Sequence, residues 1–291
     1  MKFEEQTRVY REMIENYLAS IYAPFESEPQ KPIFEAANYS LLAGGKRLRP
    51  ILALEFCRVC GGEPEKALPF GAAVEMIHTY SLIHDDLPCM DNDDYRRGRL
   101  TNHKVYGEGM AVLAGDALLT DAFAVATRTE LPEPGNIRQA IGILSECAGS
   151  LGMIGGQVLD IMSEQRQCTK QEVLDIQSRK TGRLITAPCV LGVIAGDGTE
   201  AQKEAAARFA ALLGLAFQIR DDMLDVIGSQ AELGKATGMD AEKNTFVRLY
   251  GLDKCGQLVE QYTQEAISAL DAFAEKDYLM ALAKSLTDRR A

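Results

Sequence analysis

The length, composition and charge of the chain exclude several classes of protein. It has 291 residues, of which 46% are hydrophobic and 25% charged, as is typical of a globular protein with one large domain or two small ones. A net charge of −11 disfavours non-specific binding to nucleic acid. The longest apolar runs look too short to cross a bilayer, and the charged N-terminus lacks the apolar core of a signal peptide. We therefore predict a cytoplasmic protein without stable membrane insertion.

Helical periodicity runs through the chain, whereas the alternation typical of strands is hard to find. In chain order, helices are predicted over 3–22, 31–43, from Pro50 onward, and over 64–87, 109–130, 136–165, 170–195, 200–228 and 252–289. The longest irregular stretch, 229–250, is rich in Gly, Lys and Asp. No repeat or linker marks a second domain. We predict a single all-α domain over residues 1–291.

Two clusters of aspartates are the most informative feature of the sequence. Their members are Asp85, Asp86 and Asp91 in the first cluster, and Asp221, Asp222 and Asp225 in the second. Carboxylates crowded this closely repel one another unless a cation lies between them. Oxygen ligands without paired Cys or His favour magnesium, manganese or calcium over zinc, and magnesium is usually held together with substrate phosphates. The clusters therefore predict metal-assisted binding of a diphosphate from two sides.

The second cluster lies on a predicted helix with an unusual face. Asp221 and Asp225 are four residues apart and share that face, with Gln218 and Asp222 beside them. The face continues upstream through small residues, which are Gly214, Ala211 and Ala207. We interpret this arrangement as the polar mouth of a cavity, with a solvated acidic face as the alternative.

Basic side chains gather at 46–49 and 96–99, although the chain as a whole is acidic. Arginine and lysine are the usual protein ligands of phosphate. His78, two turns before the first aspartates, is a candidate ligand contact, with a core histidine as the alternative. Lys180 and Lys235 are each most simply surface lysines, but a departing anion needs nearby cations.

Taken together, these segments resemble one protein family. HDDLPCMDNDDYRRG and FQIRDDMLD resemble the two aspartate-rich motifs of the bacterial trans-prenyl diphosphate synthases. Further landmarks follow in the family's order, namely GGKRLRP, EMIHTYSLIHDD, GGQVLD, KTG and GKATGMDAEKNTF. The resemblance covers roughly 30–250 and is closest to farnesyl-forming members, although geranylgeranyl-forming relatives share most of the motifs. It implies a helical bundle around a central cavity, usually a homodimer, that joins isopentenyl diphosphate to an allylic diphosphate.

The resemblance also implies a role for each matching residue. The two aspartate clusters would hold three magnesium ions, or manganese, on the allylic diphosphate. The residues that would contact this diphosphate directly are Arg96, Lys180 and Lys235. Those that would bind the diphosphate of isopentenyl diphosphate are Lys46, Arg49, His78 and Arg97. Those that would shape the reaction chamber are Gln157, Thr181, Phe217 and Gln218.

Product length is expected to depend on Tyr80, five residues before Asp85. At ~1.5 Å rise per residue, Tyr80 lies ~7.5 Å along the helix from the aspartates. Its direction around the helix differs from that of Asp85, so a core tyrosine is the alternative. The resemblance implies that a bulky ring here, followed by the small Ser81, closes the pocket and favours a fifteen-carbon product.

Two other functions were weighed against this one. A terpene cyclase resembles the family in fold and first motif, but its second motif usually mixes Asn, Ser and Glu, and it lacks a second basic locus. A non-catalytic partner subunit has typically lost one aspartate motif, and both motifs are intact here. We therefore favour a catalytic prenyl diphosphate synthase.

Overall fold

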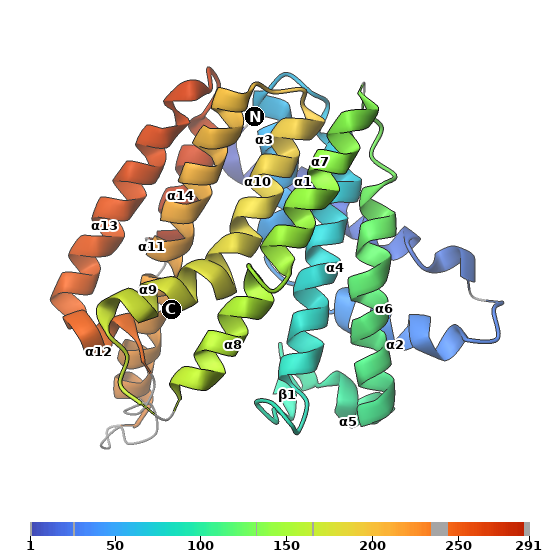
Figure 1. The fold of residues 1–291 in the computed structure, drawn as a ribbon, viewed down its shortest axis with the longest axis horizontal. Helices are drawn as coiled ribbons and strands as arrows, with labels where there is room; N and C mark the ends of the chain where they lie inside the picture. The colour runs from blue at the N-terminus through green and yellow to red at the C-terminus, as the bar shows by residue number, and fades with distance from the viewer. Residues whose placement is uncertain (1, 26, 132, 165, 234–243, 288–291) are drawn as a thin grey trace. The chain divides into compact units, whose positions relative to one another are not determined.

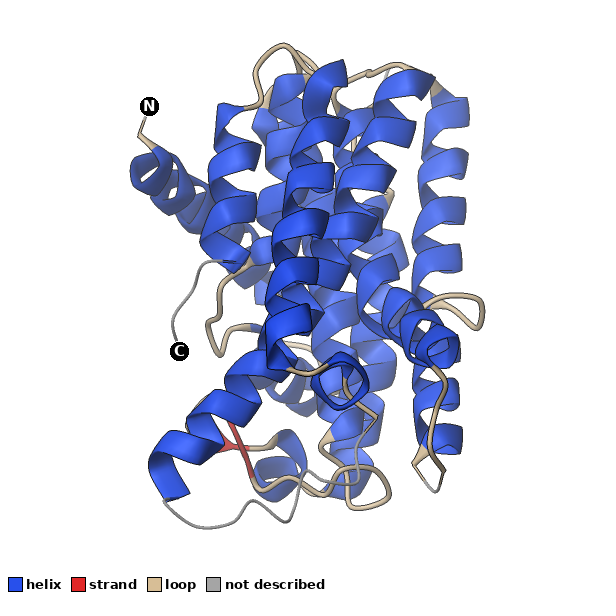
Figure 2. Ribbon diagram, turned by 90° about the vertical axis from the view of Figure 1, so that its left-hand side faces the viewer, coloured by secondary structure: helices blue, strands red, loops and turns tan. Residues whose placement is uncertain are grey.

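The computed structural model describes residues 2–25, 27–131, 133–164, 166–233 and 244–287. Nearly all regular structure in these ranges is helical (Figures 1 and 2), which confirms the predicted all-α class. The chain divides into two compact units. Unit 1 comprises 1–142 and 191–198, and unit 2 comprises 143–190 and 199–291. Each unit is described by itself.

Unit 1 is built around a buried helix, α4 (Leu68–Asp85), in which twelve of eighteen residues are buried. The other elements of this unit are α1 (Phe3–Ser20), η1 (Ala23–Phe25), α2 (Lys31–Leu41), α3 (Leu48–Val59), η2 (Pro64–Ala67), β1 (Tyr95–Arg96), β2 (Arg99–Leu100), α5 (Asn102–Tyr106), α6 (Glu108–Ala126) and the first part of α7 (Pro134–Ala148). Helices α1, α2, α3 and α6 all pack against α4, and α6 runs beside it (Figure 1). Burial on every side explains why α4 reads as continuously apolar rather than amphipathic.

Unit 2 is organised by its longest helix, α11 (Glu200–Leu233). The remaining elements are the end of α7, α8 (Met153–Ser163), α9 (Lys170–Gln177), η3 (Ser178–Gly182), most of α10 (Arg183–Ala195), α12 (Phe246–Tyr250), α13 (Leu252–Ala269), η4 (Leu270–Ala272) and α14 (Asp277–Thr287). Ile219 and Met223 of α11 join Val173, Phe246 and Cys255 in an apolar cluster. This cluster fixes α11 against α9, α12 and α13, and so sets the direction of the second aspartate motif.

Two of the predicted helices are each divided in the structure. The helix expected over 136–165 is interrupted between α7 and α8, where a Cβ added to Gly152 would lie 2.0 Å from the Cys147 carbonyl oxygen. The helix expected over 252–289 ends at α13, and Phe273 has extended backbone before α14 begins. Hydrophobic periodicity continues through both breaks, so it did not reveal them.

Short elements were also missed by the sequence analysis. Strands β1 and β2 form an antiparallel hairpin whose turn residues, Arg97 and Gly98, both have positive φ. Two-residue strands are too short to show alternation, although such a turn is the usual one in tight hairpins. Helix α12 lies inside the stretch 229–250 that was expected to be irregular.

Helix α6 has a property that the apolar runs of the sequence did not single out. Its 19 residues, with a mean hydropathy of 1.5, would be long and apolar enough to cross a membrane. Core helices of globular proteins can be equally long and apolar, and 39% of this apolar segment of α6 is buried inside the structure. Helices α4, α2 and α5 supply the packing around it.

Candidate active site

The first aspartate motif lies where α4 ends. Asp85 is the last residue of the helix, and the backbone N–H of Asp91 donates to the Asp85 carbonyl at 2.8 Å. This hydrogen bond closes the turn that contains Pro88 and brings Asp91 back toward the end of α4. Asp85 is half-buried and Asp91 is exposed, so both carboxylates lie at the surface of unit 1.

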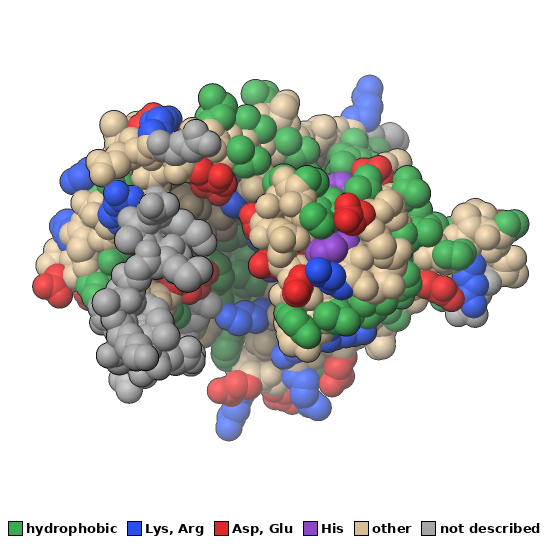
Figure 3. Space-filling model, turned by 90° about the horizontal axis from the view of Figure 1, so that it is seen from below, with side chains coloured by type: hydrophobic (Ala, Val, Ile, Leu, Met, Phe, Trp, Pro, Cys, Tyr) green, Lys and Arg blue, Asp and Glu red, His purple; other side chains and the backbone are tan. Residues whose placement is uncertain are grey.

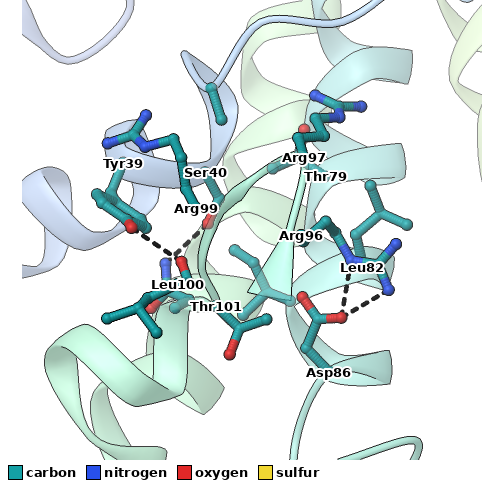
Figure 4. Close-up of a pocket in the computed structure, with 13 residues that line it drawn as sticks. Tyr39, Ser40, Thr79, Leu82, Asp86, Arg96, Arg97, Arg99, Leu100 and Thr101 are labelled. Carbon is teal, nitrogen blue, oxygen red and sulfur yellow. Dashed lines mark hydrogen bonds and ion pairs between the residues drawn. The ribbon is translucent and has the colours of Figure 1, made fainter. Parts of the chain in front are cut away.

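Asp86 has a different environment from its two partners. It is only 3% exposed, and Arg96 of the hairpin binds its Oδ1 through Nε at 2.7 Å and a terminal nitrogen at 2.6 Å (Figure 4). Burial raises the pKa of Asp86, and the hydrogen bonds and charge of Arg96 oppose that rise. Arg96 thus fixes the hairpin to α4, and its expected contact with a diphosphate stays a prediction.

The basic locus of unit 1 brings together residues that are far apart in the sequence. Arg97 donates to the Gly44 carbonyl, and a Cβ on Gly45 would lie 3.0 Å from the Arg97 guanidinium carbon. The Nε atom of Arg49 is buried and has no hydrogen-bond partner among the described residues. Lys46 is exposed on the same loop. In Figure 4, Arg97 extends away from the ion pair of Arg96.

His78 lies in the positive field of this locus. Burial lowers its pKa well below the ordinary value, and the charges of Arg49, Arg97, Arg96 and Arg47 lower it further. The imidazole is therefore neutral at pH 7, and a neutral ring can still donate one N–H to an anion. On the face shown in Figure 3, histidine side chains lie among acidic and basic ones.

A small cavity separates the hairpin from α2 and α4. Arg96, Arg99, Tyr39 and Asp86 are among its lining residues (Figure 4). The Arg99 guanidinium covers the Tyr39 ring at 4.3 Å, and the Tyr39 hydroxyl donates to the Leu100 carbonyl at 2.8 Å. The cavity has a volume of about 40 Å³, which is enough for roughly three waters. This cavity is too small for a prenyl chain.

Tyr80 points into dry surroundings inside unit 1. It is 5% exposed, and its hydroxyl is buried without a partner among the described residues. Burial, helped by the charge of Asp85, raises the pKa of Tyr80 to about 12. The ring meets His84 edge to face at 5.7 Å. Ser81 is half-buried and donates to the His78 carbonyl at 2.9 Å.

Unit 2 places Lys180 on a π-helical segment, η3. Its ammonium group lies 2.6 Å from Asp160 of α8. A Cβ on Gly156 would lie 2.2 Å from the Lys180 backbone nitrogen, so only glycine lets α8 approach η3 this closely. Asp160 was not singled out from the sequence, yet it lies three residues after Gln157 and therefore near it on the helix surface. Isolated π-helical turns occur frequently at functional sites.

A chain of hydrogen bonds links η3 to α12 through α11. Thr181 donates to Gln218 at 3.3 Å, and Gln218 donates to Asp222 Oδ1 at 3.0 Å. The other oxygen of Asp222 accepts the Phe246 backbone N–H at 2.8 Å. Burial raises the pKa of Asp222, and both hydrogen bonds oppose the rise. Asp222 therefore accepts a hydrogen bond on each carboxylate oxygen, and through Phe246 it joins α11 to the start of α12.

The other predicted residues of α11 and α8 have mixed environments. Asp221, Phe217 and Gln157 are half-buried, and Asp225 is exposed. Gly214 is buried, and a Cβ there would lie 3.3 Å from Gly182. In the predicted stripe of small residues, Gly214 thus allows close packing against η3, whereas Ala211 is exposed and Ala207 half-buried. Lys235 lies outside the described residues.

The six predicted metal ligands differ in burial and in hydrogen bonding. Within the described parts of the chain, no three His, Cys, Asp or Glu side chains form a group that could hold a metal ion. Asp86 and Asp222 already accept hydrogen bonds from the protein. The remaining aspartates of the two clusters are Asp85, Asp91, Asp221 and Asp225. All four side chains are half-buried or exposed. Their carboxylate oxygens are the type of ligand that magnesium prefers.

Comparison with known proteins gives relatives over most of the chain. The Arabidopsis thaliana heterodimeric geranylgeranyl pyrophosphate synthase large subunit 1, chloroplastic, is 47% identical over 273 residues, covering 90% of this chain and 73% of that protein. Farnesyl diphosphate synthase of Micrococcus luteus is also 47% identical, over 265 residues, covering 90% and 89% of the two chains.

Solved structures and family profiles give the same result. An apo FPP/GFPP synthase from Zymomonas mobilis has a TM-score of 0.89 and 34% identity, covering 98% of each chain. The geranylgeranyl pyrophosphate synthetase from Pyrococcus horikoshii has a TM-score of 0.88 and 30% identity over the full length of both chains. The polyprenyl synthetase family profile matches residues 30–282. With its two aspartate motifs and its helical fold, the chain belongs to the polyprenyl synthetase family.

Proposed function

We propose that this prenyltransferase condenses isopentenyl diphosphate with dimethylallyl or geranyl diphosphate to give farnesyl diphosphate and diphosphate. The observation that carries the proposal is the basic locus of unit 1. Arg49 and Arg97 lie beside the neutral His78, separate from the carboxylates of Asp85 and Asp91. A head-to-tail condensation needs two kinds of diphosphate site, and unit 1 carries both a cationic and an anionic group of side chains.

The family resemblance assigns the two aspartate clusters to the allylic substrate. On that resemblance, Asp85, Asp86, Asp91, Asp221, Asp222 and Asp225 would hold magnesium, which when bound neutralises negative charge on a departing diphosphate. Lys180, kept in place by Asp160, supplies a further fixed cation. The allylic carbon–oxygen bond breaks, and its electron pair leaves with the diphosphate.

The cationic locus would serve isopentenyl diphosphate. Arg49 offers a buried Nε donor, and Arg97 adds charge beside it. The double bond of isopentenyl diphosphate attacks the allylic cation and forms the new carbon–carbon bond. A proton is then lost, and we assign it to the departing diphosphate because no protein base was identified in the sequence.

The quaternary and cellular setting is proposed on the family resemblance. One family profile spans both units, which supports their working as one synthase domain. We propose a homodimer that acts in the cytoplasm. Exposed apolar side chains of α6, Val112 and Leu113, are consistent with a surface that another protein covers.

A geranylgeranyl-forming synthase is the second candidate, because relatives of both kinds are 47% identical to this chain. The buried Tyr80 ring favours the fifteen-carbon product. The test is to incubate the pure protein with magnesium, isopentenyl diphosphate and dimethylallyl diphosphate, and to separate the dephosphorylated products by chromatography. Farnesol is expected. Geranylgeraniol as the main product would overturn the farnesyl assignment. The absence of any elongated alcohol would overturn the proposed reaction.

A further inference from the structure

Arg47 belongs to the basic segment 46–49, yet its side chain turns into the core. The residue is 2% exposed and its side chain fully buried. Its guanidinium donates to Glu15 at 2.7 and 3.2 Å, to Glu75 at 2.8 Å and to the Leu41 carbonyl at 2.7 Å. A group held this way cannot reach a substrate, so its charge serves another purpose.

The backbone around Arg47 is unusual as well. Gly44, Gly45 and Arg47 all have positive φ, with Arg47 at 51°. A side chain other than glycine, asparagine or aspartate rarely adopts this conformation, and it persists only where the surroundings over-determine it. The partners of Arg47 come from three elements, which are α1, the end of α2, and α4. These contacts hold the loop in its strained shape at the start of α3.

The loop held by Arg47 carries the cations of the basic locus. Lys46 precedes Arg47 directly, and Arg49 lies in the first turn of α3. Arg97 donates to the Gly44 carbonyl, so it contacts the same loop from the hairpin. The directions of all three cations therefore depend on the loop conformation.

We propose that Arg47 is a positioning residue for the diphosphate of isopentenyl diphosphate, an inference that rests on the proposed function. It holds the 44–49 loop so that Lys46, Arg49 and Arg97 converge on one anion. A misplacement of about 1 Å in such a site can cost on the order of 100-fold.

The chain offers a matched control for a merely structural role. Arg58 and Glu55 form a second arginine–glutamate pair in unit 1, at 2.9 Å, with Glu55 fully buried. This pair also ties α3 to α1, through Gln6 and Tyr10. It lies at the opposite end of α3 from the loop.

The test compares two double variants, Arg47→Met/Glu75→Gln and Arg58→Met/Glu55→Gln. Each removes one cation and one buried anion, so the net charge of the unit stays the same; Arg47 is fully buried, whereas the Arg58 side chain is 29% exposed. For the first variant, the KM for isopentenyl diphosphate should rise by about 30-fold, and the KM for the allylic substrate by less than about threefold. Arg47→Lys should restore part of the affinity. The control pair should leave both KM values within about threefold.

A binding measurement tests the inference without turnover. Pyrophosphate is titrated calorimetrically into each folded protein in excess EDTA, so that metal-assisted binding is removed. The Arg47 variant should bind at least about tenfold more weakly than the wild type, and the Arg58 variant should not. Equal pyrophosphate affinity in the Arg47 variant, or an equal loss in both variants, would overturn the inference. A wild-type chain that binds pyrophosphate but yields no elongated product would overturn the proposed function alone.

Discussion

At the scale of single residues, neighbouring aspartates have different tasks. Asp85 is half-buried at the helix end, whereas Asp86 is buried and bound by Arg96. Asp221 is half-buried, whereas Asp222 is buried and accepts the Phe246 N–H. Consecutive helical residues point about 100° apart, so one member of each pair faces the protein. In each pair, one carboxylate thus holds a neighbouring element, and the metal-ligand role of both stays a prediction.

Replacing Asp85 or Asp221 with Ala should lower kcat by at least about 100-fold, because each removes a candidate ligand from the site of charge development. The melting temperature should not fall, since fewer like charges then repel one another. Asp94→Ala is the matched control, because Asp94 is exposed and pairs with Lys104 at 2.7 Å. Steady-state rates in magnesium would measure the effect. Near-normal turnover of the first two variants would contradict the assignment.

His78 predicts a pH dependence of stability. Burial and the nearby arginines hold the pKa of folded His78 well below its ordinary value. Below about pH 6.5 the unfolded chain therefore binds a proton that the folded chain does not, and stability falls as pH drops. The slope is about 1.4 kcal/mol per pH unit, or roughly 2–4 °C in melting temperature. His78→Gln should lose this dependence between pH 7.5 and 5.5. If the melting temperatures of the wild type and the variant fell in parallel with pH, the pKa of His78 would not be depressed.

Tyr80 offers two informative variants. Tyr80→Ala should shift the product from fifteen to twenty carbons or beyond, and should cost about 3–5 kcal/mol of unfolding free energy because a buried ring is lost. Tyr80→Phe should keep the product and gain about 1 kcal/mol, because the hydroxyl it removes is buried without a partner. Product chromatography and urea unfolding would measure both. An unchanged product from Tyr80→Ala would place the end of the pocket elsewhere.

At the scale of elements, glycines decide how closely helices approach. A Cβ on Gly115 of α6 would lie 2.1 Å from His84 Nε2, and this nitrogen lies 3.1 Å from the Val112 carbonyl oxygen. The absence of a side chain at Gly115 therefore makes room for the His84 ring. This ring packs against Tyr80, and His84 directly precedes Asp85. Helix α6 in this way supports the end of α4.

Gly115→Ala should lower the unfolding free energy by about 1–3 kcal/mol, because the His84 ring must move. Gly109→Ala, in the same helix, meets nothing within 4 Å and should instead raise stability by up to about 1 kcal/mol through helix propensity. Combining Gly115→Ala with His84→Ala should recover part of the loss. Chemical denaturation of the four proteins would measure this; equal effects of the two single glycine variants would rule out a steric role for Gly115.

At the scale of the whole molecule, activity and folding should respond differently to metal removal. Excess chelator should abolish product formation, and added magnesium should restore it, because the aspartates of the two clusters are oxygen ligands. The melting temperature in chelator should stay high, since helical packing within each unit holds the elements together. Turnover that persists in chelator would contradict the proposed chemistry.

The all-α class could be predicted from the sequence, and the contiguous motifs name the residues of the candidate site, whose roles stay predictions. Asp85, Asp221, Lys180 and the all-α class follow from local spacing, helical periodicity and family resemblance. The helix breaks at Gly152 and Phe273 could not be predicted, since apolar periodicity continues through them and only close packing or extended backbone marks them.

Tertiary structure alone decided what each charged residue does. In the sequence Arg47 looks like any other cation of the basic segment, and Asp160 like an ordinary helix carboxylate. The fold buries Arg47 between Glu15 and Glu75 and sets Asp160 against Lys180. Local spacing determines which side chains share a helix face, but the partner of a charge comes from another element, and only packing determines which charges are buried and which remain available to a substrate.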